Sequence, residues 1–167
     1  MRSILLALPL LALAACGHHP GREFATQAPA FDAAAFFAGQ TEGVGTFHRV
    51  LRRPKKMVIR GTGRYVDGRL LLTQRILIQD EAPRSRTFDL HRVAPGQWRG
   101  TLSDGSGPVT IVSDGNMLHM RYPDGTGYAV NQFLYLNADG RTAIDRTQVT
   151  SFGDDWAKID GTYRHLD

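Results

Sequence analysis

The chain contains very little cysteine and no second long apolar segment. Cys16 is the only cysteine of the 167 residues, so the chain cannot form an internal disulfide. After the N-terminal apolar run, no segment reaches the about 20 apolar residues that a membrane-spanning helix needs. The remainder of the chain must therefore be one domain that is held together by packing of its own apolar side chains.

Motifs for catalysis and for metal binding are also missing. The sequence has no Gly-x-Ser-x-Gly elbow, no Walker loop and no His-Glu-x-x-His. Its histidines do not have metal-ligand spacing. We therefore expect a protein that is not an enzyme, that binds no metal ion and that needs no cofactor.

The N-terminus, by contrast, carries a clear pattern. Arg2 is followed by an apolar run over residues 4–13 and then by Leu13-Ala14-Ala15-Cys16. This resembles a bacterial lipobox, in which the cysteine is acylated and becomes the first residue after cleavage. An ordinary secretory signal with a cysteine close to the cut is the alternative. We predict a signal peptide over 1–15, a lipidated tether over 16–30 and one folded domain over 31–167.

The compartment is indicated by this signal. Gly17 stands directly after Cys16, where an Asp would resemble an inner-membrane retention signal. We therefore expect an outer-membrane lipoprotein that faces the periplasm, with the inner membrane as the less favoured location. The membrane would be its partner through the lipid, and nucleic acid is not expected as a partner in that compartment.

One stretch of the chain has no acidic residue. Between Glu42 and Asp67 the sequence contains only basic charges, including Arg52, Arg53, Lys55 and Lys56. Each basic residue near an anionic membrane surface contributes about 1 kcal/mol of attraction. These four residues are predicted to contact lipid headgroups. The alternative is a solvated hairpin loop that turns at Pro54.

The sequence of the domain predicts an all-β fold. Turn pairs such as Asp67-Gly68 and Asp124-Gly125 recur along it, and apolar residues alternate between them with a period of two. Nine or ten short strands in sequential hairpins predict an antiparallel up-and-down barrel, with a β-sandwich as the alternative. Asp32 and Gly39 are suited to begin and end a short helix within residues 31–39.

A family resemblance agrees with this fold. The matching residues are Phe36-Phe37-Ala38-Gly39, Gly43-Val44-Gly45-Thr46-Phe47, Gly61, Leu70-Leu71-Leu72, Arg86-Thr87-Phe88-Asp89-Leu90, Trp98-Arg99-Gly100, Asp139-Gly140-Arg141-Thr142 and Phe152-Gly153. Together they resemble DUF3833, a bacterial family of lipocalin-like lipoproteins. The resemblance implies a lipocalin-like (calycin-like) barrel in the cell envelope and no established activity.

The interior of such a barrel is the main candidate for a site. A small barrel either fills itself with side chains or holds one small ligand. The residues predicted to face inward and line the site are Tyr65, Phe88, Leu90, Trp98, Tyr128 and Tyr163. We predict a lipoprotein that binds or shuttles a lipid or another apolar molecule. The alternative is a filled barrel that acts as a non-catalytic scaffold or interaction module of an envelope assembly.

Overall fold

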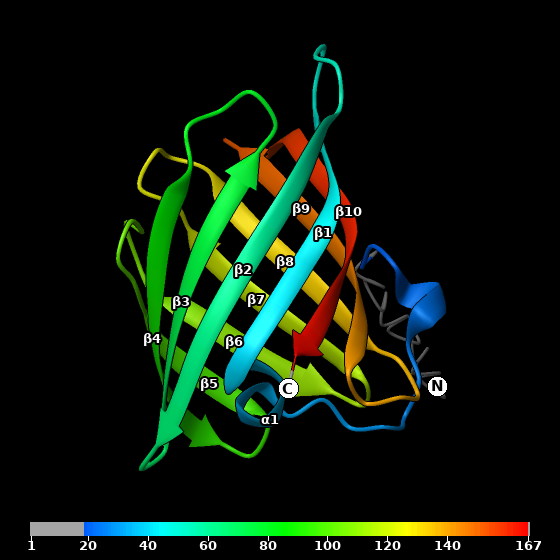
Figure 1. Cartoon of the computed structure of the whole chain (residues 1–167), viewed down its shortest axis with the longest axis vertical. Coiled ribbons are helices and arrows are strands. Elements are labelled where there is room, and N and C mark those ends of the chain that lie inside the picture. Colours follow the sequence, from blue (N-terminus) through cyan, green and yellow to red (C-terminus); the bar gives the residue numbers. More distant parts are fainter. Residues whose placement is uncertain (1–18, 167) are drawn as a thin grey trace, which may run out of the picture.

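Ten antiparallel strands form a closed barrel in the computed structural model, which describes residues 19–166 (Figure 1). Each strand pairs with its neighbours in the sequence, and β1 closes the barrel against β10. The elements are η1 (Arg22–Phe24), α1 (Ala33–Phe37), β1 (Gly39–Arg49), β2 (Lys55–Val66), β3 (Arg69–Ile78), β4 (Arg84–Ala94), β5 (Gln97–Leu102), β6 (Val109–Asp114), β7 (Met117–Pro123), β8 (Ala129–Leu136), β9 (Thr142–Ser151) and β10 (Asp154–Leu166). The predicted up-and-down barrel is confirmed.

The hairpins form where the turn pairs predict them. Val66 pairs with Arg69, so Asp67-Gly68 is the whole loop between β2 and β3. Both loop residues have positive φ angles, 50° and 77°, as a two-residue turn of this kind requires. Such a turn fixes the register of the hairpin, and the register decides which side chains face inward.

Alternation along each strand then divides inside from outside. On β3 the inward side chains are Leu70, Leu72, Gln74, Ile76 and Ile78, all buried. The residues between them face outward and are exposed or half-buried. The same pattern continues around the barrel, so its interior receives one face of every strand.

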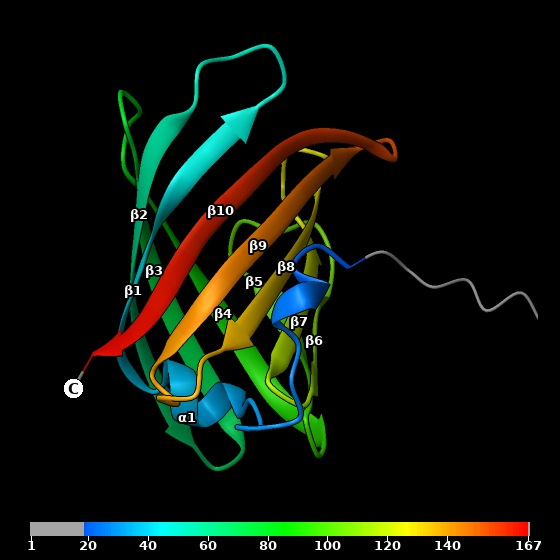
Figure 2. The same cartoon turned by 90° about the vertical axis from the view of Figure 1, so that its right-hand side faces the viewer.

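The helix α1 closes one end of the barrel (Figures 1 and 2). Asp32 caps it: its carboxylate accepts hydrogen bonds from the backbone N–H groups of Ala34 (2.8 Å) and Ala35 (3.1 Å). Phe36 and Phe37 are buried. A Cβ at Gly63 on β2 would collide with the carbonyl oxygen of Phe37, so this glycine allows the helix to approach the strand.

The segment before α1 lies against the outer wall of the barrel. The Tyr135 hydroxyl on β8 donates to the carbonyl oxygen of Pro20 (2.8 Å), and the side-chain amide of Asn116 donates to that of Phe24 (3.1 Å). Gly21 has a φ of 81°, and a Cβ there would come within 2.7 Å of the Tyr135 ring. We call residues 19–30 the strap. It covers part of the predicted tether, while Cys16 and the rest of that stretch lie outside the described residues.

Candidate ligand-binding cavity

A cavity of about 330 Å³ occupies the end of the barrel opposite α1. Its wall comes from the strand ends that are farthest from the helix, and we call this part of the barrel the open half. The apolar side chains of the wall belong to Phe47, Met57, Ile59, Ile76, Ile78, Leu102, Val130, Val149, Trp156 and Ile159. Most of them are inward members of the alternating pattern, so the cavity is built by the same rule as the core.

The other end of the interior is filled with side chains. Leu70, Leu72, Phe88, Leu90 and Trp98 are almost inaccessible there. With α1 as a lid, these buried side chains occupy the end of the barrel that we call the closed half. The barrel is therefore half filled and half hollow.

Four polar side chains lie between the two halves. Gln74 and Arg86 come from β3 and β4, and Gln132 and Asp145 come from β8 and β9. On each of these strands the next inward residue on the side of α1 is apolar, as Leu72 and Phe88 illustrate. We call these four residues the polar layer. Three of them, all except Gln74, line the cavity.

Arg86 is the positive charge of the polar layer. Its Nε donates to Gln74 Oε1 (3.0 Å) and one of its Nη atoms donates to the Tyr122 hydroxyl (2.8 Å). The guanidinium also lies 5.0 Å from the ring centroid of Phe88 and 5.2 Å from that of Tyr122. Burial opposes its charge, but Tyr122, Tyr163 and Asp104 raise the pKa of Arg86 overall. The side chain is therefore a fixed cation beside the cavity.

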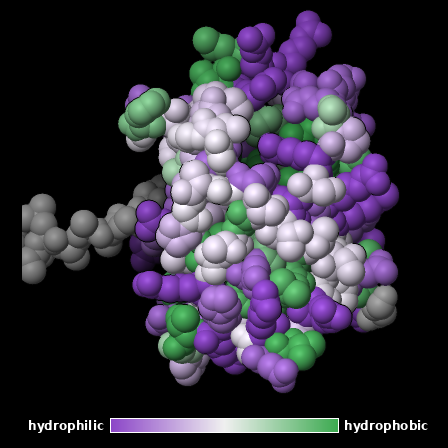
Figure 3. All heavy atoms as spheres, turned by 90° about the vertical axis from the view of Figure 1, so that its left-hand side faces the viewer, coloured by the Kyte–Doolittle hydropathy of each residue, from purple (hydrophilic) through white to green (hydrophobic). Residues whose placement is uncertain are grey.

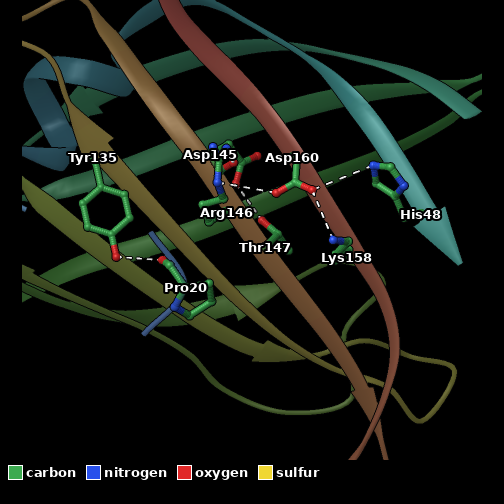
Figure 4. A network of polar contacts seen from close by, with 8 residues as sticks. All are labelled: Pro20, His48, Tyr135, Asp145, Arg146, Thr147, Lys158 and Asp160. Atoms are coloured by element: carbon green, nitrogen blue, oxygen red, sulfur yellow. Dashed lines mark hydrogen bonds and ion pairs between the residues drawn. The ribbon is translucent and has the colours of Figure 1, made fainter. Parts of the chain in front are cut away.

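Asp145 is the acidic group of the same layer. Its carboxylate accepts hydrogen bonds from Thr147 Oγ1 (2.7 Å) and Gln132 Nε2 (3.2 Å). Burial raises the pKa of Asp145 to about 7, because a carboxylate loses its hydration in this interior. The buried carboxyl group is therefore harder to ionise than an aspartate in water. Figure 4 shows Asp145 and Thr147 beside an outer cluster in which Asp160 contacts Arg146, His48 and Lys158.

The six side chains predicted to line the site occupy different places. Tyr128 lines the cavity, where its ring lies 4.3 Å from that of Trp156. Phe88, Leu90, Trp98 and Tyr163 are buried but do not line the cavity. Tyr65 is 40% exposed, and its ring meets the edge of Trp98 at 5.9 Å.

The polar members of the cavity are not among the residues predicted from the sequence. Arg86 occupies an inward position, two residues before Phe88 on the same strand, and Asp145 lies inward between Ala143 and Thr147. A charged residue at an inward position is therefore the signal in the sequence. It is visible only once the register of each strand is fixed.

The four predicted headgroup residues are located around the β1–β2 loop, at the open end. Arg52, Arg53 and Lys56 are exposed. Lys55 is half-buried and forms an ion pair with Glu81 at 2.9 Å. Three of the four charges thus face solvent beside the cavity mouth.

Two large apolar residues are exposed at the same end of the barrel as these charges. Leu51, at the tip of the β1–β2 loop, is 98% exposed, and Phe152, in the β9–β10 turn, is fully exposed. The β1–β2 loop follows a strand end that is held against β10, because the backbone N–H of Val50 donates to the carbonyl oxygen of Trp156 (3.1 Å). The β1–β2 loop is the highest point of Figure 1, and the highest atoms of Figure 3 belong to strongly hydrophobic and strongly hydrophilic residues side by side. We call Leu51, Phe152, Arg52, Arg53 and Lys56 the rim.

The strap begins about half-way along the outer wall of the barrel, where the His19 ring lies 5.1 Å from the Phe133 ring on β8 (Figure 2). Pro20 shares an outer groove of about 360 Å³ with Arg49, Val50 and Asp155.

Within residues 19–166 no group of three or more His, Cys, Asp or Glu side chains could hold a metal ion. In the same part of the chain, no helix is long and apolar enough to cross a membrane.

Comparisons with known proteins identify the family and the fold. The family model described as protein of unknown function DUF3833 matches residues 10–164, so the chain belongs to this family, as the sequence motifs indicate. No curated protein matches the chain in sequence.

Solved structures share the lipocalin-like barrel. The S-type phycobiliprotein lyase CPES from Guillardia theta superimposes with a TM-score of 0.61 at 8% identity, over 82% of this chain and 93% of that one. Rv2717c from M. tuberculosis gives 0.59 at 18% identity, over 81% and 96%. A protein of unknown function from the DUF3598 family of Nostoc punctiforme gives 0.56 at 11% identity, over 84% of this chain and 51% of that one. At these identities the similarity establishes the fold.

Proposed function

We propose that this member of the DUF3833 family is a carrier that binds a lipid or another apolar small molecule in the open half of its barrel. The observation that carries the proposal is the cavity of about 330 Å³, whose wall combines the apolar side chains named above with polar and charged ones. Its volume falls within the about 300–1,000 Å³ that is usual for small-molecule sites. The chain shares its fold with an S-type phycobiliprotein lyase, and this similarity supports a function other than that of a purely structural scaffold.

The proposed mechanism is reversible burial of the ligand. Apolar surface that leaves water contributes roughly 25 cal/mol per Å², and the wall of the open half supplies that surface. The closed half keeps the barrel rigid while the cavity fills and empties. No bond is made or broken, and we propose no cofactor.

We further propose that the carrier is a lipoprotein anchored through Cys16 in the outer membrane and facing the periplasm. Only Gly17 and His18 separate Cys16 from the first described residue. Three residue steps span at most about 10 Å of extended chain. A lipid on Cys16 would therefore hold the wall on which the strap begins, on the side of β7 and β8, close to the bilayer.

The chemistry of the rim indicates that the open end also contacts the membrane. Leu51 and Phe152 are exposed on two loops of this end, where burial in a bilayer would remove their apolar surface from water. Arg52, Arg53 and Lys56 beside them carry charges that attract anionic headgroups. We propose that the rim contacts the membrane, so that an apolar ligand passes between bilayer and cavity with little exposure to water.

Native purification followed by mass spectrometry tests the carrier function. Residues 17–167, which retain every described residue, are expressed without the lipid, purified without detergent and extracted for bound small molecules. We expect an apolar compound at close to one molecule per chain. An empty extract, together with no gain in melting temperature on addition of fatty acids or phospholipids, would favour the scaffold alternative.

A variant that fills the cavity provides the matched control. Ile78 lines the cavity on β3, and Ile78→Trp places a larger side chain into the open space. Val112→Trp makes a comparable change on the outer wall, where Val112 is 47% exposed. The inner variant should lose the co-purifying compound and the outer one should keep it.

A further inference from the structure

The polar layer narrows the class of ligand. We infer that the molecule bound in the open half carries one terminal oxyanion, which binds to the Arg86 guanidinium and the Tyr122 hydroxyl at the inner end of the cavity. This inference rests on the proposed carrier function and adds the chemistry of the head group. The charge of Arg86 is the first reason for it.

A guanidinium inside a barrel needs a partner. Removing a charge from water is costly unless it is paired or hydrogen-bonded. The groups that contact Arg86 are the Gln74 amide, the Tyr122 hydroxyl and two aromatic faces, all of them neutral. Among the ion pairs within residues 19–166, none includes Arg86.

The guanidinium also keeps donors free for a ligand. Arginine has five N–H groups, and the hydrogen bonds of Arg86 within the described chain occupy two of them, on Nε and on one Nη atom. Arg86 lines the cavity, so its remaining N–H groups border the space where a ligand would lie. A carboxylate or a phosphate is the group that such a planar set of donors binds best.

The acidic side chains that line the cavity are Glu81, Asp104, Asp124 and Asp145, and within residues 19–166 none of them forms an ion pair with Arg86. Asp104 attracts the Arg86 charge, but it is exposed to solvent. The Asp145 carboxylate instead accepts hydrogen bonds from Thr147 and Gln132. The cavity therefore offers a ligand a cation without an ion-pair partner among the described residues, together with apolar side chains along its wall.

Binding of matched ligands to residues 17–167 tests this inference. Isothermal titration calorimetry compares dodecanoate, monododecyl phosphate and 1-dodecanol, which share one alkyl chain and differ in the head group. Hydrogen bonds to charged groups contribute enough for about a tenfold preference or more. We expect one or both anions to bind at least about tenfold more tightly than the alcohol, and their order identifies carboxylate or phosphate as the favoured oxyanion.

Two arginine variants test whether Arg86 causes the preference for the anions over the alcohol. Arg86→Gln should bring the three dissociation constants to within about threefold of one another, because it removes the cation from the inner end. Arg75→Gln removes a charge from an exposed, outward-facing residue of β3 that does not line the cavity, and it should leave the preference in place. Equal binding of alcohol and anions by the unmodified protein, or a preference that survives Arg86→Gln, would overturn the inference.

A measurement on the unmodified protein covers the case in which Arg86→Gln does not fold. The carboxyl carbon of [1-¹³C]dodecanoate reports its own titration by NMR, and contact with a guanidinium should hold the pKa of the bound acid below that of the free acid. An unchanged or raised pKa would contradict the inference. If neither the three ligands nor the neutral probe N-phenyl-1-naphthylamine binds, the carrier function itself fails.

Discussion

The closed and open halves of the barrel are built from the same strands but differ in what their inward residues do. On β3, Leu70 and Leu72 are completely buried in the closed half, whereas Ile76 and Ile78 face a cavity. On β4, Phe88 and Leu90 fill the interior while Arg86 carries a charge beside the cavity. Position along the barrel axis, and not the alternation itself, decides whether an inward residue stabilises the fold or lines a site.

The polar layer separates the inward residues that stabilise the fold from those that line the cavity. Gln74, Gln132 and Asp145 are each under 7% exposed, although they are polar. Buried polar groups of this kind lower stability unless they are hydrogen-bonded, and they are favoured where a site needs them. The difference between the halves therefore predicts that substitutions in the closed half reduce stability, and that substitutions at the polar layer change pH dependence and binding.

The largest effect should come from the acid of the polar layer. The folded-state pKa of Asp145, about 7, lies above its ordinary value of 3.8, so the folded chain binds more protons than the unfolded chain between these pH values. Stability is therefore lost as pH rises from about 4 to about 7. Asp145→Asn removes this loss, and it should raise the free energy of unfolding by about 3 to 4 kcal/mol at pH 8.

Urea unfolding at pH 4, 6 and 8 measures this effect. The unmodified protein should become less stable across the series, while the Asn variant should change much less from this cause. At pH 4 the two proteins should be similar, because the carboxyl group is then mostly protonated in the folded state. An identical pH dependence in both proteins would show that folding does not raise the pKa of Asp145.

Truncation in the closed half should have the next largest effect. Leu90→Ala should lower the free energy of unfolding by about 3 kcal/mol, because it leaves a void among fully packed neighbours. Ile78→Ala, at the cavity wall, should lower it by only about 1 to 2 kcal/mol, because part of that side chain already borders empty space. Denaturant unfolding at one pH compares the two, and equal losses would remove the distinction between the halves.

Loss of the helix cap should have a smaller effect on the same half. Asp32→Ala removes the hydrogen bonds to the first turn of α1, which is expected to cost about 1 kcal/mol. It also removes the exposed ion pair with Arg92, which contributes little. Arg92→Ala is the matched control, because it breaks the ion pair and leaves the cap intact.

Hydrogen exchange locates the consequence of losing the cap. Amide protons of α1 and of the neighbouring part of β2 should exchange faster in Asp32→Ala than in Arg92→Ala. Residues around the cavity mouth should be unaffected in both variants. Faster exchange at the mouth would mean that the two halves are coupled more strongly than their packing indicates.

Substitutions at the rim should cause the smallest change in the free energy of unfolding. Leu51→Ser and Phe152→Ser should alter the free energy of unfolding by less than about 0.5 kcal/mol, because both side chains are exposed. Together they should weaken binding to vesicles of phosphatidylglycerol and phosphatidylcholine by about tenfold in a sedimentation assay. Val66→Ser with Val93→Ser removes apolar surface elsewhere, at two residues that are each 53% exposed. That control pair should leave vesicle binding unchanged, and an equal loss in both pairs would argue against membrane contact at the rim.

The barrel could be predicted because its signals are local. Asp67-Gly68 is a turn by its own backbone preferences, and the period of two on β3 is readable from consecutive residues. Asp32 and Gly39 likewise fix the ends of α1 from within a few residues, and Gly39 has the positive φ of 89° that ends a helix well. Closure into a barrel then results because sequential hairpins leave two edges that pair.

The site could be predicted only in part, because a position along the barrel axis depends on distant residues. Phe88 and Tyr128 are both aromatic and look alike in the sequence, yet one belongs to the closed half and the other lines the cavity. Which end is filled depends on where α1 docks. Arg86 is not recognisable as a functional candidate in the sequence, because its inward position is apparent only in the register of β4 with β3.

The docking of the strap also could not be predicted from local sequence patterns. A polar segment with Gly21 and Pro29 predicts a linker, whereas its docking depends on Asn116 and Tyr135, about ninety residues or more away in the chain. Long-range hydrogen bonds of this kind leave no periodic signal in the sequence. The strap matters for the proposed function because it determines the part of the outer wall, beside β7 and β8, from which the predicted lipid anchor extends.

The central claim is that only one half of the barrel receives a ligand, and amide NMR tests it most directly. Titration of ¹⁵N-labelled residues 17–167 with dodecanoate should shift the amide signals of cavity residues such as Tyr122, Tyr128 and Thr147. The signals of Leu72, Leu90 and Trp98 in the closed half should move little. Shifts confined to the closed half, or the absence of any shift up to the solubility limit of the ligand, would contradict the account.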